Sequence, residues 1–459
     1  MLKDVKSRRN VCKFLVMNSI AIFLFFITVR IRIPAINYDL KTIMIDHVVS
    51  LLRMIPKFDD VYGTLIIFIG ALMPFVLGTW KKGIVSKIFA LINLIAIPIT
   101  LIWIFKPSFV PQKFFDENML PFIYYRITLP VATLLPIASL ALPFLLNYGL
   151  MEFIGVFFNP LMRPVFKTPG KSAVDISASF VGGCAVGVLI TNRTYKEGGY
   201  TKKEATIIAT GFSTVAISFM VIVSKALGGI ADKRYLLMNW GMFFLTSILI
   251  TALVTAITVR LYPLSKKEDV GYMGKKVEKE QPIKLNEVIP RAIEEGLTAC
   301  SKSESFTKCL VNNLKDGLVM LLNVPPVLIS IGFIALLLAE YTPVFNVIAY
   351  LYYPFALLLG YGKEAYILAK ACAISIADMF LPASIVGGAS LFTQVTMAIV
   401  CIAEVIFFTG SIPCLLTSDM EISMKDIIIL WIERVILALI LASLMVRFVY
   451  PLFGIPIFG

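Results

Sequence analysis

Residues 172–190, SAVDISASFVGGCAVGVLI, are as long and as apolar as a membrane-spanning helix, yet Gly182 and Gly183 stand side by side near the centre. Glycine favours a helix less than any residue except proline, so the pair indicates a break at membrane depth. Basic residues flank the stretch on both sides: Arg163, Lys167 and Lys171 before it, and Arg193, Lys196, Lys202 and Lys203 after it. Lysine and arginine collect on the cytoplasmic side of a membrane. We therefore predict a re-entrant hairpin rather than a full crossing.

The rest of the chain has the composition of a membrane protein. Of its 459 residues, 58% are hydrophobic and 15% are charged, whereas soluble domains carry roughly 25% charged residues. Apolar stretches long enough to cross roughly 30 Å of hydrocarbon recur throughout. We expect spans at 14–29, 64–80, 84–105, 127–150, 205–223, 237–259, 318–339, 391–416 and 422–450. The predicted fold is all-α, a polytopic bundle of transmembrane helices.

Charge and cysteine content restrict the partners and cofactors. The net charge of +13 falls mainly in loops between apolar stretches, where it indicates topology rather than a nucleic-acid partner. It places the amino terminus in the cytoplasm and the chain in the cytoplasmic (inner) membrane, surrounded by the lipid bilayer. Seven scattered cysteines and a single histidine, His47, favour neither disulfides nor a metal site. We expect no metal and no cofactor.

A second broken segment follows later in the chain. An amphipathic stretch with two prolines, residues 149–167, precedes the first hairpin. Residues 341–361 also contain two prolines and precede an interrupted apolar segment that ends at Gly387 and Gly388, the glycine pair at which we expect the second break. Counting the crossings between them gives two inverted repeats, each with a re-entrant hairpin. The expected domains are N-terminal transmembrane helices at 1–148, a first repeat at 149–260, a cytoplasmic amphipathic connector at 261–315 and a second repeat at 316–459. Inverted repeats with broken helices are typical of secondary transporters.

Polar residues inside these segments are the candidate contacts for a substrate or ion. They are Asp175, Ser177 and Ser179 before the first glycine pair, Thr210, Ser213, Thr214 and Ser218 in a hydroxyl stripe that begins at Thr206, and Asp378, Thr393, Glu404 and Ser411 in the second repeat. By helical wheel, Thr393, Glu404 and Ser411 share one face, with unwinding expected at 409–413. A hydroxyl stripe can bind a polar substrate or join two helices, and both interpretations stay open.

Glu404 is the most informative candidate. Apolar or small residues surround it on both sides, so its carboxylate must face protein or water. Asp378 and Lys370 are likewise charged groups at membrane depth. The functional interpretation makes the carboxylates contacts for a proton, a sodium ion or a substrate. The alternative is a structural pair between Lys370 and Asp378.

The sequence contains no motif for nucleotide-driven or hydrolytic chemistry. Residues 169–172, PGKS, end like a phosphate-binding loop, but Val165 stands where that loop requires its first glycine. A single histidine leaves little room for a hydrolytic triad. We do not expect an enzyme, and a carboxylate-based intramembrane enzyme that uses Asp378 and Glu404 is a formal alternative.

Two stretches resemble a known family. LMEFIGVFFNPLMRPVFKTPGKSAVDISASFVGG (150–183) and TYKEGGYTKKEATIIATGFST (194–214) resemble the Gate, or nucleoside-recognition, domain, and the layout of the whole chain most resembles the YjiH-like branch. The resemblance implies a hairpin-containing transport architecture, similar to parts of concentrative nucleoside transporters, the bacterial ferrous-iron transporter and spore-maturation membrane proteins. Unlike the iron transporter, the chain has no GTPase domain. No binding residue is carried over from these families.

The sequence therefore predicts a secondary transporter or permease for a small polar solute, with nucleoside-like solutes as one candidate class. The two hairpins and the polar faces of spans 205–223 and 391–416 would line its site, and a homo-oligomer is compatible with this function. The rival prediction is a membrane scaffold or assembly component that transports nothing.

Overall fold

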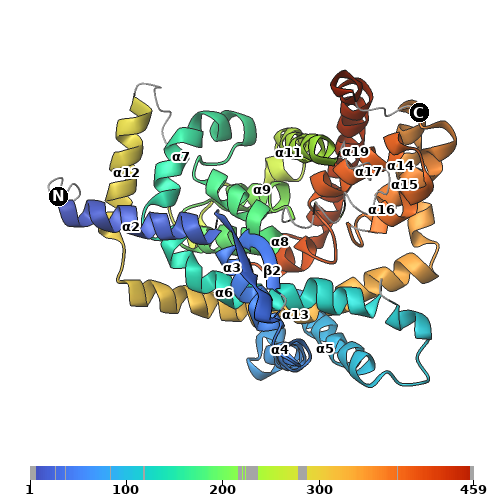
Figure 1. Cartoon of the computed structure of the whole chain (residues 1–459), viewed down its shortest axis with the longest axis horizontal. Helices are drawn as coiled ribbons and strands as arrows, with labels where there is room; N and C mark the ends of the chain where they lie inside the picture. The colour runs from blue at the N-terminus through green and yellow to red at the C-terminus, as the bar shows by residue number, and fades with distance from the viewer. Residues whose placement is uncertain are drawn as a thin grey trace.

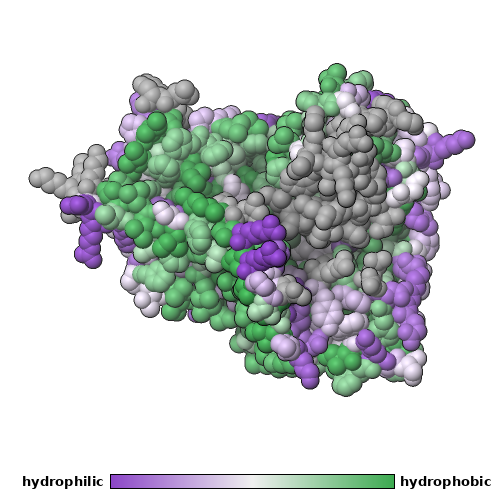
Figure 2. All heavy atoms as spheres, viewed as in Figure 1, coloured by the Kyte–Doolittle hydropathy of each residue, from purple (hydrophilic) through white to green (hydrophobic). Residues whose placement is uncertain are grey.

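The computed structural model describes residues 7–25, 27–36, 38–82, 84–116, 119–215, 220, 223, 236–277, 287–379 and 381–454. Regular structure within these residues is helical, with one two-stranded sheet near the amino terminus (Figure 1). Five of the described helices are long and apolar enough to cross a membrane: Phe58–Val76, Phe122–Leu146, Gly241–Thr258, Phe306–Tyr341 and Met424–Phe448. Hydrophobic side chains cover much of the face seen in Figure 2, as contact with lipid requires. The predicted helical membrane bundle is confirmed.

The amino-terminal part contains an element that the sequence prediction lacks. Helix α2 (Arg8–Phe25) begins before and ends before the predicted span 14–29. Strands β1 (Thr28–Ile33) and β2 (Tyr38–Ile43) follow and pair antiparallel. The next helix, α3 (Met44–Arg53), is tied to this sheet by the buried His47, whose ring nitrogens lie 2.6 Å from the Tyr38 hydroxyl and 2.9 Å from the Val29 carbonyl. The lone histidine thus has a structural role.

A long helix, α13 (Phe306–Tyr341), organises the amino-terminal spans. Helices α4 (Phe58–Val76), α5 (Ile84–Phe105) and α6 (Leu129–Leu146, preceded by the π-helical turn Phe122–Thr128) all pack against it. The bounds of α5 agree with the predicted span 84–105. In contrast, α13 begins twelve residues before the predicted span 318–339, because the amphipathic residues that begin at Phe306 continue directly into the membrane helix.

The first hairpin is confirmed by contacts between its two legs. Helix α8 (Ser172–Lys196) is broken at Gly183, where φ is 80° and ψ is 179°. The Thr191 hydroxyl donates to the Asp175 carboxylate at 3.0 Å, although the two residues are 16 positions apart. In a straight helix they would lie about 24 Å from each other. The chain therefore folds back on itself at the glycine pair.

Close backbone contact holds the interfacial helix against the start of this hairpin. Helix α7 (Leu150–Leu161) is followed by a π-helical turn at Met162–Phe166, and it passes so near the hairpin that a Cβ atom on Gly170 would lie 1.9 Å from the Gly155 carbonyl oxygen. A Cβ atom on Gly155 would lie 2.7 Å from the Lys171 amide nitrogen. Both positions therefore accept only glycine without a shift of the backbone.

The second broken segment also folds back, but its break lies elsewhere than predicted. After α14 (Val344–Leu358) and a short turn at Gly362–Glu364, the legs are α15 (Ala365–Ile374) and α16 (Leu381–Ile385), which continues into the 3-10 turn Val386–Gly388. The Glu364 carboxylate accepts hydrogen bonds from the Ser390 amide (2.8 Å) and hydroxyl (2.6 Å), so start and end of the segment meet. The unwound tip is at 375–379. Gly387 and Gly388 are exposed at its far end, and their predicted role as the break is wrong.

The helix that follows each hairpin is discontinuous. Helix α9 (Lys202–Gly211) ends at Gly211, well before the predicted residue 223. Helix α17 (Leu391–Glu404) ends at Glu404, the next residue, Val405, has a φ of 63°, and a short helix, α18 (Ser411–Leu416), begins after the gap. Unwinding thus occurs at 405–410, before the predicted 409–413. Two continuous helices, α11 (Leu236–Thr258) and α19 (Met424–Phe448), pack against α17 (Figure 1).

The connector between the repeats includes an amphipathic helix, as predicted. Helix α12 (Val288–Lys302) packs on α7 and α2, and the Asn10 side-chain amide donates to the Leu297 carbonyl at 2.9 Å. A Cβ atom on Gly149 would lie 2.1 Å from the Gly296 carbonyl oxygen, so two glycines allow this packing.

A capping box starts α9, as the sequence TKKE predicts. The Thr201 hydroxyl accepts from the Glu204 amide at 3.2 Å, and the Glu204 carboxylate accepts from the Thr201 amide at 3.0 Å. We expect Thr201→Ala to lower the free energy of unfolding by about 1 kcal/mol, because an amide at the helix start loses its acceptor. Thermal unfolding in detergent measures this loss. Thr201→Ser keeps the hydroxyl, and a Thr201→Ser variant as unstable as Thr201→Ala would contradict the explanation.

Candidate functional site

The C-terminal ends of the two discontinuous helices meet at one buried arginine. Arg434, in the middle of α19, is 1% exposed. Its guanidinium donates to the Ala403 carbonyl at 2.7 Å and the Glu404 carbonyl at 2.8 Å, both at the end of α17. It also donates to the Gly211 carbonyl, at the end of α9, at 3.2 Å. One side chain therefore joins the first repeat to the second.

Electrostatics explains why a cation stands there. The last carbonyls of a helix have no partner within that helix, and they carry the negative end of the helix dipole. Two such ends brought together repel each other unless a positive charge lies between them. Thr255 of α11 completes the arrangement: its hydroxyl oxygen lies 3.1 Å from an Arg434 nitrogen and 2.9 Å from the Gly211 carbonyl oxygen. Sequence analysis missed Arg434, although the adjacent charges Glu433 and Arg434 inside an apolar span were a signal for it.

Glu404 occupies the centre of this junction. Its side chain is fully buried, and neither carboxylate oxygen has a hydrogen-bond partner among the described residues. The neighbouring polar groups are Ser375 and Asp378 in the tip of the second hairpin and Trp431 on α19. The Trp431 ring nitrogen donates to the Ser375 hydroxyl at 3.4 Å, and both groups lie beside the Glu404 carboxylate. A carboxylate without donors in a closed interior is costly, so its presence calls for an explanation.

Asp378 lies in the unwound tip and is 1% exposed. Its carboxylate accepts from the Leu381 amide at 3.2 Å and from the Thr409 hydroxyl. The unwound backbone beside it is paired as well, because the Phe408 amide donates to the Ile376 carbonyl at 2.6 Å. The alternative that pairs Asp378 with Lys370 stays a prediction.

The candidates in the first hairpin lie apart from Glu404. Asp175 is buried between the hairpin legs, where it accepts from Thr191. The Ser179 hydroxyl lies 2.8 Å from the Phe212 carbonyl, just after the end of α9. Ser177 is exposed, and its hydroxyl donates to the Ala173 carbonyl at 2.8 Å.

The predicted hydroxyl stripe is not continuous, because α9 ends at Gly211. The Thr210 hydroxyl donates to the Thr206 carbonyl of its own helix at 2.7 Å. Ser213 and Thr214 follow the helix, and the Thr214 hydroxyl lies 3.5 Å from the Ile402 carbonyl of α17, across the junction. Ser218 lies outside the described residues.

The predicted common face of Thr393, Glu404 and Ser411 is also wrong, because the helix breaks between the last two. Thr393 lies at the start of α17, where its hydroxyl donates to Glu364. The Ser411 hydroxyl accepts from the Phe407 amide at 3.0 Å and so pairs an amide of the unwound segment. Of the predicted candidates, Glu404 and Asp378 come together, and Thr214 touches the same junction.

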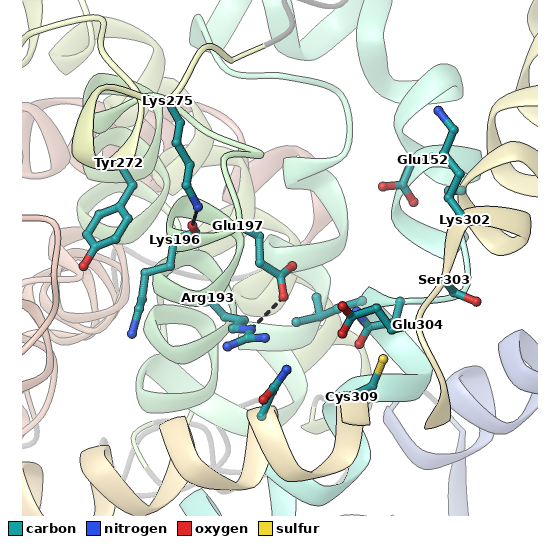
Figure 3. A pocket seen from close by; sticks show the side chains of 14 residues that line it. Glu152, Arg193, Lys196, Glu197, Tyr272, Lys275, Lys302, Ser303, Glu304 and Cys309 are labelled. Carbon is teal, nitrogen blue, oxygen red and sulfur yellow. Dashed lines mark hydrogen bonds and ion pairs between the residues drawn. The ribbon is translucent and has the colours of Figure 1, made fainter. Parts of the chain in front are cut away.

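Each hairpin is flanked by a cavity. A cavity of about 660 Å³ lies beside the end of the first hairpin, between α7, α8, α12 and α13 (Figure 3). Arg193 and Glu197 pair across its floor at 2.8 Å, and Lys275 reaches the Lys196 carbonyl at 3.1 Å. A second cavity, of about 320 Å³, is lined by Ile374, Leu381 and Ile385 of the second hairpin and by the ion pair of Lys113 with Glu340.

Comparisons with known proteins connect this architecture to a family. Residues 128–230 match the Gate family model, which is described as nucleoside recognition. An uncharacterised protein of Alkalihalophilus pseudofirmus is 36% identical over 307 residues, which cover 66% of this chain and 64% of that protein. The sporulation integral membrane protein YlbJ of Bacillus subtilis is 24% identical over 167 residues, which cover 36% of this chain and 38% of YlbJ. The chain thus spans less than two thirds of either relative.

A solved structure of CNTnw in an inward-facing substrate-bound state covers 96% of this chain and 92% of its own, with a TM-score of 0.37 and 13% identity. The segment that matches the family model holds α6, α7, the first hairpin and α9. The chain is accordingly a multi-pass membrane protein whose residues 128–230 are similar to the Gate family.

Proposed function

We propose that the chain is a secondary transporter of a small polar solute, with its site at the junction of α9, α17 and the tip of the second hairpin. The observation that carries the proposal is Glu404, a buried carboxylate without a hydrogen-bond partner, placed where two discontinuous helices end against each other. Unwound backbone at membrane depth is tolerated where it lies inside protein or lines a cavity. Transporters build their midplane sites from such helix ends.

The two cavities support the same function. One lies beside the first hairpin and the other beside the second, so each hairpin has open space into which it can shift. The Asp378 carboxylate lies directly behind the second cavity, because the amide that it accepts from belongs to Leu381 in the cavity wall. Small movements of either hairpin would open the junction to one side of the membrane. The Gate family description makes nucleoside-like solutes the first class to test.

A membrane scaffold is the second candidate. Several polar groups that could bind a solute are satisfied by the protein itself, since Thr210 donates to its own helix and Thr393 donates to Glu364. The name of YlbJ refers to sporulation rather than to transport. Glu404 distinguishes the two candidates, because a scaffold gains nothing from an unpartnered buried carboxylate.

The test is a thermal-shift screen followed by counterflow. The full chain in nanodiscs is heated with nucleosides, nucleobases or amino acids, and any class that raises the melting temperature is then loaded into proteoliposomes. We expect one class to stabilise the protein and to drive exchange of the labelled compound. A folded chain that no class stabilises, and that exchanges none of them, would support the scaffold.

A further inference from the structure

The carbonyl groups at the junction form the kind of site that holds a cation in other transporters. At unwound membrane helices, free carbonyls and the C-terminal ends of half-helices coordinate the coupling sodium ion or proton. Here the corresponding carbonyls belong to Gly211, Ala403 and Glu404. All three already accept hydrogen bonds from Arg434, at 2.7–3.2 Å. The position of a mobile cation is therefore filled by a cation that belongs to the protein.

This internal cation is permanent. An arginine side chain is not deprotonated in proteins. Arg434 stands in the middle of a continuous helix, α19, and its remaining contact to Thr255 of α11 anchors it from a second direction. It cannot dissociate from the junction in the way that a sodium ion leaves its carbonyl ligands. An exchangeable ion must consequently bind elsewhere.

The Glu404 carboxyl group, beside the junction, offers a place for such an ion. The groups that face it from the packed elements are Ser375 and Asp378 in the hairpin tip, Trp431 and Arg434 on α19, Tyr352 on α14, Cys372 on α15 and Cys401 on its own helix. Only Arg434 among them is a fixed positive charge, and its donors point at carbonyls. Neither Glu404 oxygen accepts a hydrogen bond. A proton on the carboxyl group removes the buried charge without requiring any further ligand.

We infer that the exchangeable coupling ion is a proton on Glu404, and that Arg434 occupies the carbonyl site that a sodium ion would need. The inference rests on the proposed transport function, because a coupling ion has a role only in a transporter. In the step itself, a hydronium ion on one side of the membrane donates a proton to a Glu404 oxygen: an O–H bond of hydronium breaks, an O–H bond on Glu404 forms, and a water molecule is released. After the hairpin shifts, the O–H bond on Glu404 breaks, and a water molecule on the other side takes up the proton as hydronium. Nothing is oxidised or reduced.

Trp431 provides a probe for this proton. The chain has four tryptophans, and replacing Trp80, Trp103 and Trp240 by phenylalanine leaves Trp431, beside Glu404, as the reporter. Its emission is recorded against pH in nanodiscs, in sodium chloride and in choline chloride of equal ionic strength. We expect one sigmoidal transition that is the same in both salts. The transition should be lost in Glu404→Gln, and it should move to lower pH in Asp378→Asn, because that change removes a neighbouring negative charge.

Two results would overturn the inference. One is an emission change that depends on sodium at constant pH and disappears in Glu404→Gln. The other is a transition that neither Glu404→Gln nor Asp378→Asn alters, or the absence of any transition. If Glu404→Gln does not fold, two measurements still test the inference. They are the emission transition in sodium chloride against that in choline chloride, and the pH midpoint of the transition in Asp378→Asn. A chain that binds the proton but exchanges no solute would contradict the proposed transport and leave proton binding at Glu404 intact. Transport driven by sodium would support the proposed transport and contradict the proton as the coupling ion.

Discussion

Replacing Arg434 by methionine is expected to lower the free energy of unfolding by about 3–5 kcal/mol. The change removes the Arg434 donors to the Ala403 and Glu404 carbonyls and leaves the Gly211 carbonyl with the Thr255 hydroxyl alone. Each unpaired buried group costs about 1–3 kcal/mol. Methionine keeps most of the apolar stem of the arginine side chain. The loss of stability therefore comes from the missing hydrogen bonds and charge rather than from an unfilled volume. The melting temperature and the folded fraction after gel filtration in detergent measure the effect.

Arg447→Met is the matched control for this prediction. Arg447 stands on the same helix, but its guanidinium makes one described hydrogen bond, to the Leu359 carbonyl at 2.6 Å, and lies over the Phe392 ring. We expect a loss of about 1 kcal/mol there. Adding Glu404→Gln to Arg434→Met should recover part of the stability, because no carboxylate is then left without its cation. Equal stability of Arg434→Met and Arg447→Met would show that the helix ends do not depend on Arg434.

Replacing Gly170 by valine is expected to prevent α7 from packing on the first hairpin. The Cβ position at Gly170 lies 1.9 Å from the Gly155 carbonyl oxygen and 2.7 Å from the Asn159 amide nitrogen. Both neighbours are backbone atoms of α7, so no side chain can move aside. Forcing extra atoms into a packed interior typically costs about 1–3 kcal/mol when side chains can adjust. We expect a loss at or above that range, seen as a fall in melting temperature or as failure to recover a monodisperse protein.

A glycine without neighbours gives the control. Gly387 has no atom within 4 Å of its Cβ position. Gly387→Val should therefore leave the melting temperature within the range of ordinary surface changes, about 0.5 kcal/mol. If Gly170→Val were tolerated as well as Gly387→Val, the close contact between α7 and the hairpin would not exist in the membrane.

Structural features that depend on neighbouring residues could be predicted from the sequence. Gly182 and Gly183 break α8 because glycine tolerates the backbone angles that a turn requires, and the observed φ of Gly183 is one of these. The capping box at Thr201 is likewise determined locally, by the four consecutive residues 201–204. The domain boundaries, the inverted orientation of the second repeat, the YjiH-like assignment and the cytoplasmic amino terminus stay predictions.

Other features depend on contacts between distant segments and could not be read locally. The tip of the second hairpin unwinds at 375–379 because its carbonyls find donors at Phe408 and Thr409, thirty or so positions later. Residues 375–379 contain no glycine or proline that marks the break. Helical-wheel arguments for Ser213 and Ser411 assumed continuous helices, and they were wrong for the same reason. The strand pair was more accessible, since TVRIRI alternates polar and apolar residues.

The two halves of the junction are unequal. Thr255 contacts the end of α9, whereas the arginine that contacts the end of α17 also reaches back to Gly211. A single arginine shared by both helix ends makes the centre asymmetric. Exchanging one half for a second copy of the other would therefore not reproduce the junction.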